Sequence, residues 1–83
     1  MKQIFYLVTV LIESRESYTD AHYLYASLDK AKAAMKRQID EAQENFDFAG
    51  GDRVIDLPYC VEWRDYFGDQ GYTVGIDEIE LQD

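Results

Sequence analysis

The run from Leu28 to Phe46 constrains the fold more than any other part of this chain of 83 residues. Apolar residues recur in it at steps of three or four, the spacing of one face of an α-helix. They are Leu28, Ala31, Met35, Ile39, Ala42 and Phe46. No Gly or Pro interrupts the run, and Ser27 before it is a good N-cap. The sequence therefore predicts one long helix whose apolar stripe needs a surface to cover.

Strand-like segments lie on both sides of this helix. Gln3–Glu13 is almost continuously apolar, as in a strand covered on both faces, and His22–Ala26 alternates after a polar loop. Beyond the helix, Tyr59–Phe67 also alternates. A turn at Gly68–Gly71 then leads into a last strand, Tyr72–Leu81. The expected order is β-β-α-β-β, which is an α+β fold with a four-stranded antiparallel sheet and one long helix packed on one face.

The segment between the helix and the third strand is expected to be irregular. Asp47–Asp52 contains two consecutive glycines, so it ends the helix and predicts a flexible loop. Arg53–Asp56 follows and is interpreted as a short strand stub that ends at Leu57–Pro58. The stub is not counted among the four strands.

The apolar residues of the last strand change phase. Val74 and Ile76 share one face of an ideal strand, whereas Ile79 and Leu81 belong to the other. One extra residue would restore a common face. The pattern therefore predicts a β-bulge near Asp77–Glu78.

Length and composition predict a single domain, residues 1–83. The apolar fraction of 47% argues against disorder despite the charge. One cysteine, Cys60, excludes an internal disulfide framework and is typical of a reducing compartment. The apolar run Ile4–Ile12 is too short to span a bilayer and is followed at once by charged residues rather than by a cleavage site. We therefore expect a soluble cytoplasmic protein.

Charge is divided very unevenly between the two halves of the chain. Residues 1–37 carry six bases and four acids, whereas residues 38–83 carry two bases and thirteen acids, for a formal net charge of −9. Such concentrated negative charge repels nucleic acid and membrane surfaces and steers the protein toward basic partners. We expect a protein partner with a basic surface, and neither direct nucleic-acid binding nor membrane binding.

Residues that carry catalytic chemistry are sparse. His22 is the one histidine, which excludes a two-histidine mechanism or a His-based metal site within one chain. Cys60 stands beside aromatic residues and is interpreted as a small buried hydrophobe rather than a nucleophile. Gly50–Gly51 lacks the lysine of a phosphate-binding loop, and the acids around Asp47 do not follow an EF-hand spacing. The sequence predicts no enzyme, cofactor or metal.

Carboxylates and exposed tyrosines remain as candidates for partner binding. Acids on the second half of the helix and on the last strand repeat at a rise of roughly 6–7 Å, so that a row of them would imitate a nucleic-acid backbone. Tyrosine favours interfaces because one end of its ring is apolar and the other is polar. The candidate partner-binding residues are Asp40, Glu41, Glu44, Asp47, Glu78, Glu80, Tyr18 and Tyr66.

The number of aromatic residues is a separate observation. Seven tyrosines and one tryptophan exceed what a core of this size buries. We expect the sheet face away from the helix to be lined by Tyr23, Tyr25, Tyr59, Tyr66 and Tyr72. Such a face would be a protein-binding surface or the seam of a homodimer. The alternative is that these tyrosines reflect strand propensity alone.

In size, acidity and element order, the whole chain resembles the small inhibitors that phages and mobile elements encode, of the anti-CRISPR or anti-restriction type. This resemblance implies a non-catalytic protein that inhibits a nucleic-acid-handling, defence-type protein, by charge-led binding or by nucleic-acid mimicry. The carboxylates named above would then block the basic groove of that protein. The alternative function is a homodimeric structural or regulatory interaction module that uses the aromatic sheet face.

Overall fold

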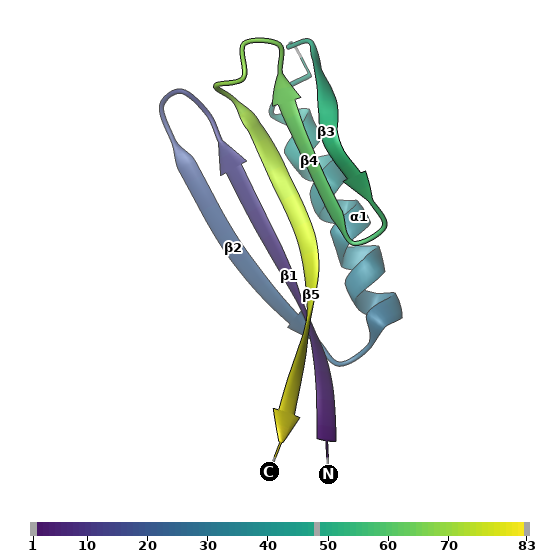
Figure 1. Cartoon of the computed structure of the whole chain (residues 1–83). Helices are drawn as coiled ribbons and strands as arrows, with labels where there is room; N and C mark the ends of the chain where they lie inside the picture. Colours follow the sequence, from purple (N-terminus) through teal and green to yellow (C-terminus); the bar gives the residue numbers. More distant parts are fainter. Residues whose placement is uncertain (1, 48, 83) are drawn as a thin grey trace.

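The computed structural model describes residues 2–47 and 49–82. One antiparallel sheet carries a single helix on one of its faces (Figure 1). In chain order the elements are β1 (Lys2–Glu13), β2 (Tyr18–Tyr25), α1 (Leu28–Glu44), β3 (Gly51–Leu57), β4 (Cys60–Asp65) and β5 (Gly71–Gln82). Across the sheet the order is β2-β1-β5-β4-β3. The expected α+β layout of one helix on an antiparallel sheet is confirmed, but the sheet has five strands, so the prediction of four is wrong.

The additional strand is β3, which was predicted to be only a stub. It pairs antiparallel with β4, and its register shifts between Arg53 and Ile55, as at a β-bulge. After Gly51, every residue of β3 is exposed, because the strand lies at the edge of the sheet and α1 does not cover it. A strand without a buried face shows no alternation of apolar and polar residues, and its sequence therefore resembles a loop.

The predicted bulge in the last strand is absent from β5, whose described register with β1 is unbroken from end to end. The change of phase has a different cause. Tyr72, Val74 and Ile76 are buried on the face that α1 covers. Ile79 lies on the opposite face by regular alternation, near the end of the strand. Both faces of β5 are therefore apolar, each over a different part of its length.

The helix matches its prediction closely. It spans Leu28–Glu44, two residues less than the apolar stripe that ends at Phe46. Ser27 is the N-cap, and its side chain accepts a hydrogen bond from the backbone N–H of Lys30 at 3.4 Å. This bond satisfies one of the free N–H groups of the first turn.

The core between α1 and the sheet is built around three stacked aromatic rings. The ring centroids of Phe46 and Trp63 are 5.3 Å apart, and those of Trp63 and Tyr72 are 5.9 Å apart. The hydroxyl of Tyr72 donates a hydrogen bond to Oε1 of Gln43 on α1 at 2.8 Å. Burial raises the pKa of Tyr72, because removal from water disfavours its charged form.

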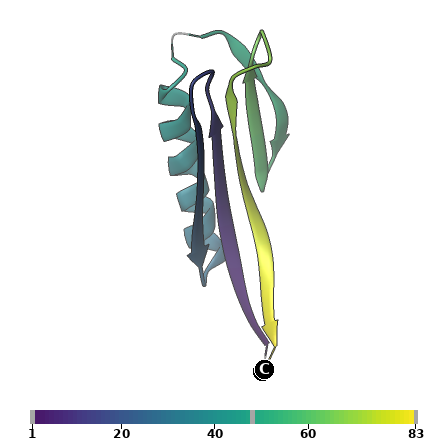
Figure 2. The ribbon, with the colours of Figure 1, turned by 90° about the vertical axis from the view of Figure 1, so that its left-hand side faces the viewer.

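The molecule is elongated, with principal extents of 47 × 22 × 17 Å. At one end, here called the loop end, lie the β1–β2 turn, the α1–β3 loop and the β4–β5 turn (Figure 1). The other end, here called the strand end, is formed by the start of β1 and the end of β5. Figure 2 shows these two strands running on past the first turn of α1. The helix begins near the strand end and finishes near the loop end.

Candidate functional site

The carboxylates predicted to bind a partner fall into two separate groups. Those of the first group, here called the helix acidic patch, are Asp40, Glu41, Glu44 and Asp47. They lie toward the loop end, on or just after the second half of α1, and all are exposed. The second group is Glu78 and Glu80, which are exposed on β5 at the strand end. The structure does not bring the two groups together in one surface.

The helix acidic patch is placed where negative charge is unfavourable for the helix itself. The last turn of α1 contains no basic residue, and its carbonyl groups already form the negative end of the helix dipole. Asn45 Nδ2 donates hydrogen bonds to the backbone oxygens of Glu41 and Ala42, which satisfies part of that end. Among the described residues, no side chain forms an ion pair with these carboxylates. Their charge is therefore presented to solvent.

Charges of both signs line the groove between α1 and the β3–β4 hairpin, which has a volume of about 310 Å³. Lys32 and Lys36 line it from α1, and Arg53 lines it from β3, where it pairs with Asp56 at 3.1 Å. Asp40 also reaches this groove. Because the signs are mixed, the groove favours neither a polyanion nor a strongly basic partner.

The two predicted tyrosines, Tyr18 and Tyr66, are both exposed at the loop end. Tyr66 is 73% exposed, and its ring leans on Gly50, where an added Cβ would lie 2.7 Å from Cε2 of the ring. Phe67 beside it is 83% exposed. The sequence pattern placed Phe67 on the same strand face as Trp63, but β4 ends before it and Phe67 lies in the following turn. The turn that the sequence predicted at Gly68–Gly71 therefore begins two residues earlier, at Tyr66.

The predicted tyrosine-lined face away from the helix is wrong. Tyr72 is in the core under α1, and Tyr25 packs against that core. Tyr23 lies on the same side as Tyr25, because alternate residues of β2 share a face. Tyr59 and Tyr66 lie in turns rather than in a strand. The alternation was predicted correctly, but the helix covers the tyrosine side of the sheet.

The face of the sheet away from α1, here called the open face, carries aliphatic side chains instead. On it Leu7 pairs with Leu24 across β1 and β2, and Phe5 pairs with Ile79 across β1 and β5. Leu24 is 58% exposed, and Leu81 in the next row is 51% exposed. These five residues are here called the open apolar strip. It extends toward the strand end.

An ion-pair network occupies the other half of the open face. Arg64 on β4 contacts Glu13 on β1 at 2.9 Å and Glu62 on its own strand at 2.7 Å. Hydrogen bonding and the positive charge of Arg64 hold the pKa of Glu13 below its usual range. Gly71 lies between Glu13 and Arg64 in the sheet, so that no side chain separates them. This network links β4 to β1 across β5 and is structural in character.

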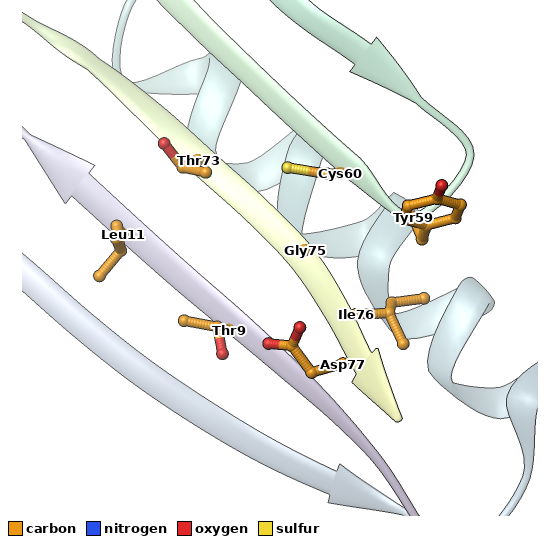
Figure 3. A pocket seen from close by; sticks show the side chains of 8 residues that line it. All are labelled: Thr9, Leu11, Tyr59, Cys60, Thr73, Gly75, Ile76 and Asp77. Carbon is orange, nitrogen blue, oxygen red and sulfur yellow. The ribbon is translucent and has the colours of Figure 1, made fainter. Parts of the chain in front are cut away.

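A shallow hollow of about 250 Å³ lies on the open face over Gly75 (Figure 3). Thr9 and the half-buried Cys60 stand on the two strands beside Gly75, which has no side chain to fill the space. Thr9 Oγ1 lies 3.3 Å from Nδ1 of His22, and Nε2 of His22 lies 2.8 Å from Oδ1 of Asp20.

The order hydroxyl, imidazole, carboxylate resembles a nucleophile with its base and orienting acid. Acyl transfer also requires donors aimed at the developing oxyanion. Thr9 lies in β1, which pairs with strands on both sides, so the backbone N–H groups around it are engaged in the sheet. His22 and Asp20 are about half exposed to water. This chain of contacts therefore orients surface side chains and does not form an acyl-transfer site.

Within residues 2–47 and 49–82, no group of three or more His, Cys, Asp or Glu side chains is placed to hold a metal ion. The described helix is not long and apolar enough to cross a membrane. Comparisons of this chain with protein-family models, with curated proteins and with solved structures found no match.

Proposed function

We propose that this protein is a non-catalytic binding domain that attaches through its carboxylates to a basic surface of another protein. The helix acidic patch carries this proposal. It places four exposed carboxylates within eight consecutive positions, and none of them forms an ion pair within the described part of the chain. A basic partner would supply the missing counter-charges.

The target is proposed to be a protein that handles nucleic acid, which the domain would inhibit in the manner of the small acidic inhibitors of mobile elements. Asp40 and Glu44 are one helical turn apart, at a rise of about 6 Å. A groove that binds a phosphate backbone presents Lys and Arg at comparable intervals, so these carboxylates would compete with phosphates for them. The net charge of −9 would also accelerate encounter with such a groove.

The position of the patch supports the proposal independently. Each exposed acid near the end of a helix costs about 0.3–1 kcal/mol, because it meets the negative pole of the dipole. Glu41 and Glu44 both lie in the last turn of α1. Solubility alone would be served by acids anywhere on the surface, whereas binding requires them together.

The test is affinity capture from lysate of the native host, infected or not with phage, after nuclease treatment and with washes at low and high salt. The wild-type protein should retain a basic nucleic-acid-binding protein that salt releases. Glu41→Lys/Glu44→Lys should lose that protein. The control Glu16→Lys/Asp52→Lys changes the net charge equally at exposed positions outside the patch and should retain it. Equal capture by both double variants, or capture that salt does not weaken, would rule the proposal out.

A homodimeric structural or regulatory module remains the second candidate, because of the open apolar strip. It would replace the tyrosine-lined face that the sequence predicted. Leu24 is more exposed than Leu81 in this strip, so Leu24→Lys would disrupt a seam formed there. Sedimentation would detect a salt-resistant dimer of the wild-type protein that this variant loses. A monomer at all salt concentrations would exclude this second function.

A further inference from the structure

We infer that β2 pairs edge to edge with β2 of a second copy of this chain, so that the two sheets join into one continuous antiparallel sheet. The surface involved is the edge of the sheet opposite β3. This pairing stands independently of the proposed function, and it uses backbone groups rather than the open apolar strip.

β2 is a long and regular edge strand. Its outer side has no strand beside it in the described part of the chain (Figure 1). It is eight residues long and pairs with β1 without a register shift, from Tyr18 opposite Glu13 to Tyr25 opposite Tyr6. Proteins protect exposed edges with bulges, prolines, lysines or very short strands. β2 has none of these features, since it contains no Pro, Gly or Lys.

The opposite edge of the same sheet is protected. The register of β3 shifts between Arg53 and Ile55, and Pro58 directly follows its last residue, Leu57. A bulge bends an edge away from a straight partner strand, and a proline has no N–H to donate. The two edges of this sheet therefore differ, and the straight one at β2 is the one that can accept another strand.

The backbone groups of β2 point alternately to β1 and to solvent. At the end of the hairpin, the N–H of Ser14 donates a hydrogen bond to the backbone oxygen of Ser17 at 2.9 Å. Hydrogen-bonded and non-hydrogen-bonded pairs alternate along an antiparallel ladder, so Tyr18 is not hydrogen-bonded to β1 and Thr19 is. The residues that direct their N–H and C=O groups outward are therefore Tyr18, Asp20, His22 and Leu24.

One register makes this edge complementary to itself. A twofold axis between the two copies of Ala21 sets Asp20 of each copy opposite His22 of the other. Because Asp20 and His22 direct their backbone groups outward, these opposed residues exchange the hydrogen bonds of the new ladder. Oδ1 of Asp20 already lies 2.8 Å from Nε2 of His22 in its own strand. Carboxylates and imidazoles then alternate both along and across the paired strands, so that no like charges are directly opposed.

The two neighbouring registers are less favourable. An axis through Asp20 sets the two carboxylates opposite each other, and like charges directly opposite are destabilising. An axis through His22 sets Asp20 opposite the apolar Leu24. With the axis at Ala21, Leu24 instead faces Tyr18 of the second copy, which is an aromatic–aliphatic pair. These two side chains are 58% and 62% exposed in the single chain, so the pairing covers apolar surface as well.

The symmetry of this pairing sets the arrangement of the helices. The twofold axis is perpendicular to the joined sheet, so both copies of α1 lie on the same face of it. The helix acidic patch remains exposed in each copy. On the proposed function, a dimer would therefore present two patches to one basic surface, and two linked attachments hold more tightly than one.

Sedimentation and hydrogen exchange of the full chain test the pairing. The wild-type protein should form a dimer whose population rises with protein concentration. On dimerisation the amide protons of Asp20 and His22 should exchange more slowly with solvent, whereas those of Thr19 and Tyr23, which are already bonded to β1, should change little. A monomer at every concentration, or added protection that does not alternate along β2, would overturn the inference.

A proline on the outward side of β2 separates this edge from the open apolar strip. His22→Pro removes an N–H that faces solvent in the single chain, a position where an edge strand tolerates proline. It should remain folded and should raise the dimer dissociation constant by about tenfold or more, since the ladder loses a hydrogen bond on each side of the axis. The matched control His22→Thr keeps the N–H and should dimerise more tightly than His22→Pro. Equal dimerisation of both variants would overturn the inference and favour a seam on the open apolar strip.

Two charge variants test the register without a proline. Asp20→Lys sets a lysine opposite His22, and His22→Asp sets two carboxylates opposite each other, so each variant alone should dimerise more weakly than the wild-type protein. Mixed in equal amounts, the two variants should form a mixed dimer, because the introduced lysine of one faces the introduced aspartate of the other. If the mixture does not associate while the wild-type protein does, this pairing is excluded. Neither variant alters the helix acidic patch, so capture of a basic partner remains a separate result.

Discussion

Nη2 of Arg64 lies 2.9 Å from Oε1 of Glu13, so a single side chain crosses β5 and links β4 to β1. The crossing is possible because Gly71 occupies the position between them. An added Cβ at Gly71 would lie 3.0 Å from Cδ of Arg64 and only 2.0 Å from the backbone oxygen of Trp63. The link between β4 and β1 thus depends on the absence of a side chain at Gly71.

We expect Gly71→Ala to destabilise the fold by about 1–3 kcal/mol, because its methyl group has no room beside a backbone oxygen. Gly75→Ala is the matched control. It lies in the same strand, but its nearest neighbours would be ordinary contacts at 3.5 and 3.9 Å. Urea unfolding of the two variants and the wild-type protein measures the difference. Equal losses would show that the space around Gly71 can relax.

The ion pair of Glu13 and Arg64 predicts a stability that falls in acid. The folded-state pKa of Glu13 is lowered by Arg64, so its contribution is fully present above the unfolded pKa, about 4.3 for Glu. It is lost as the pH falls through the folded value. We expect Glu13→Gln to be less stable than the wild-type protein at pH 7, with a difference that shrinks below pH 4. Unfolding free energies of the two proteins, measured from pH 7 to below pH 4, test this prediction. A stability difference that does not change with pH would contradict it.

Removal of the Tyr72 hydroxyl should cost about 0.5–1.5 kcal/mol, the net value of a typical hydrogen bond. The ring would keep its stacking on Trp63, and Gln43 would lose the donor that it has at 2.8 Å. Tyr72→Ala should cost about 3–5 kcal/mol, because it also empties the centre of the aromatic core. Thermal or urea unfolding compares the two variants. A loss of stability for Tyr72→Phe as large as that for Tyr72→Ala would show that the hydroxyl, rather than the ring, accounts for the stabilising effect of Tyr72.

Glu44→Lys should have opposite effects on folding and on binding. It places a positive charge in the last turn of α1, where the dipole favours one, and should raise stability by about 0.3–1 kcal/mol at low salt. The same change should weaken capture of the basic partner. Unfolding and capture assays on this single variant test both parts. A variant that binds normally would show that Glu44 is not needed for binding.

The elements best predicted from the sequence are those with one clearly buried face. The apolar stripe of the helix, its N-cap at Ser27 and the alternation around Trp63 in β4 all appear in the structure where they were expected. By contrast, β3 was underestimated because it lies at the sheet edge, exposed on both faces. The bulge predicted in β5 was wrong because Ile79 contributes to the other face of the sheet.

The candidate site was predicted only in part. The exposure of the carboxylates and of Tyr18 and Tyr66 follows from their polarity and from the turns beside them. Their distribution between the loop end and the strand end could not be predicted from the sequence. Separation along the chain says little about separation in space in a sheet with the order β2-β1-β5-β4-β3. The network around Arg64 was not anticipated either, since its partner Glu13 is 51 positions away in the sequence.

By itself, the sequence determined which side chains share a face, because the periods of 2 for a strand and 3.6 for a helix are properties of the backbone. It also determined the excess of negative charge and its concentration in the second half. Only the tertiary structure decided which face of the sheet the helix covers, and hence that Tyr25 and Tyr72 are turned toward the core. It also decided where β4 begins along β5, with Cys60 opposite Gly75. Both outcomes depend on contacts between distant segments, and these exist only once the whole sheet has formed.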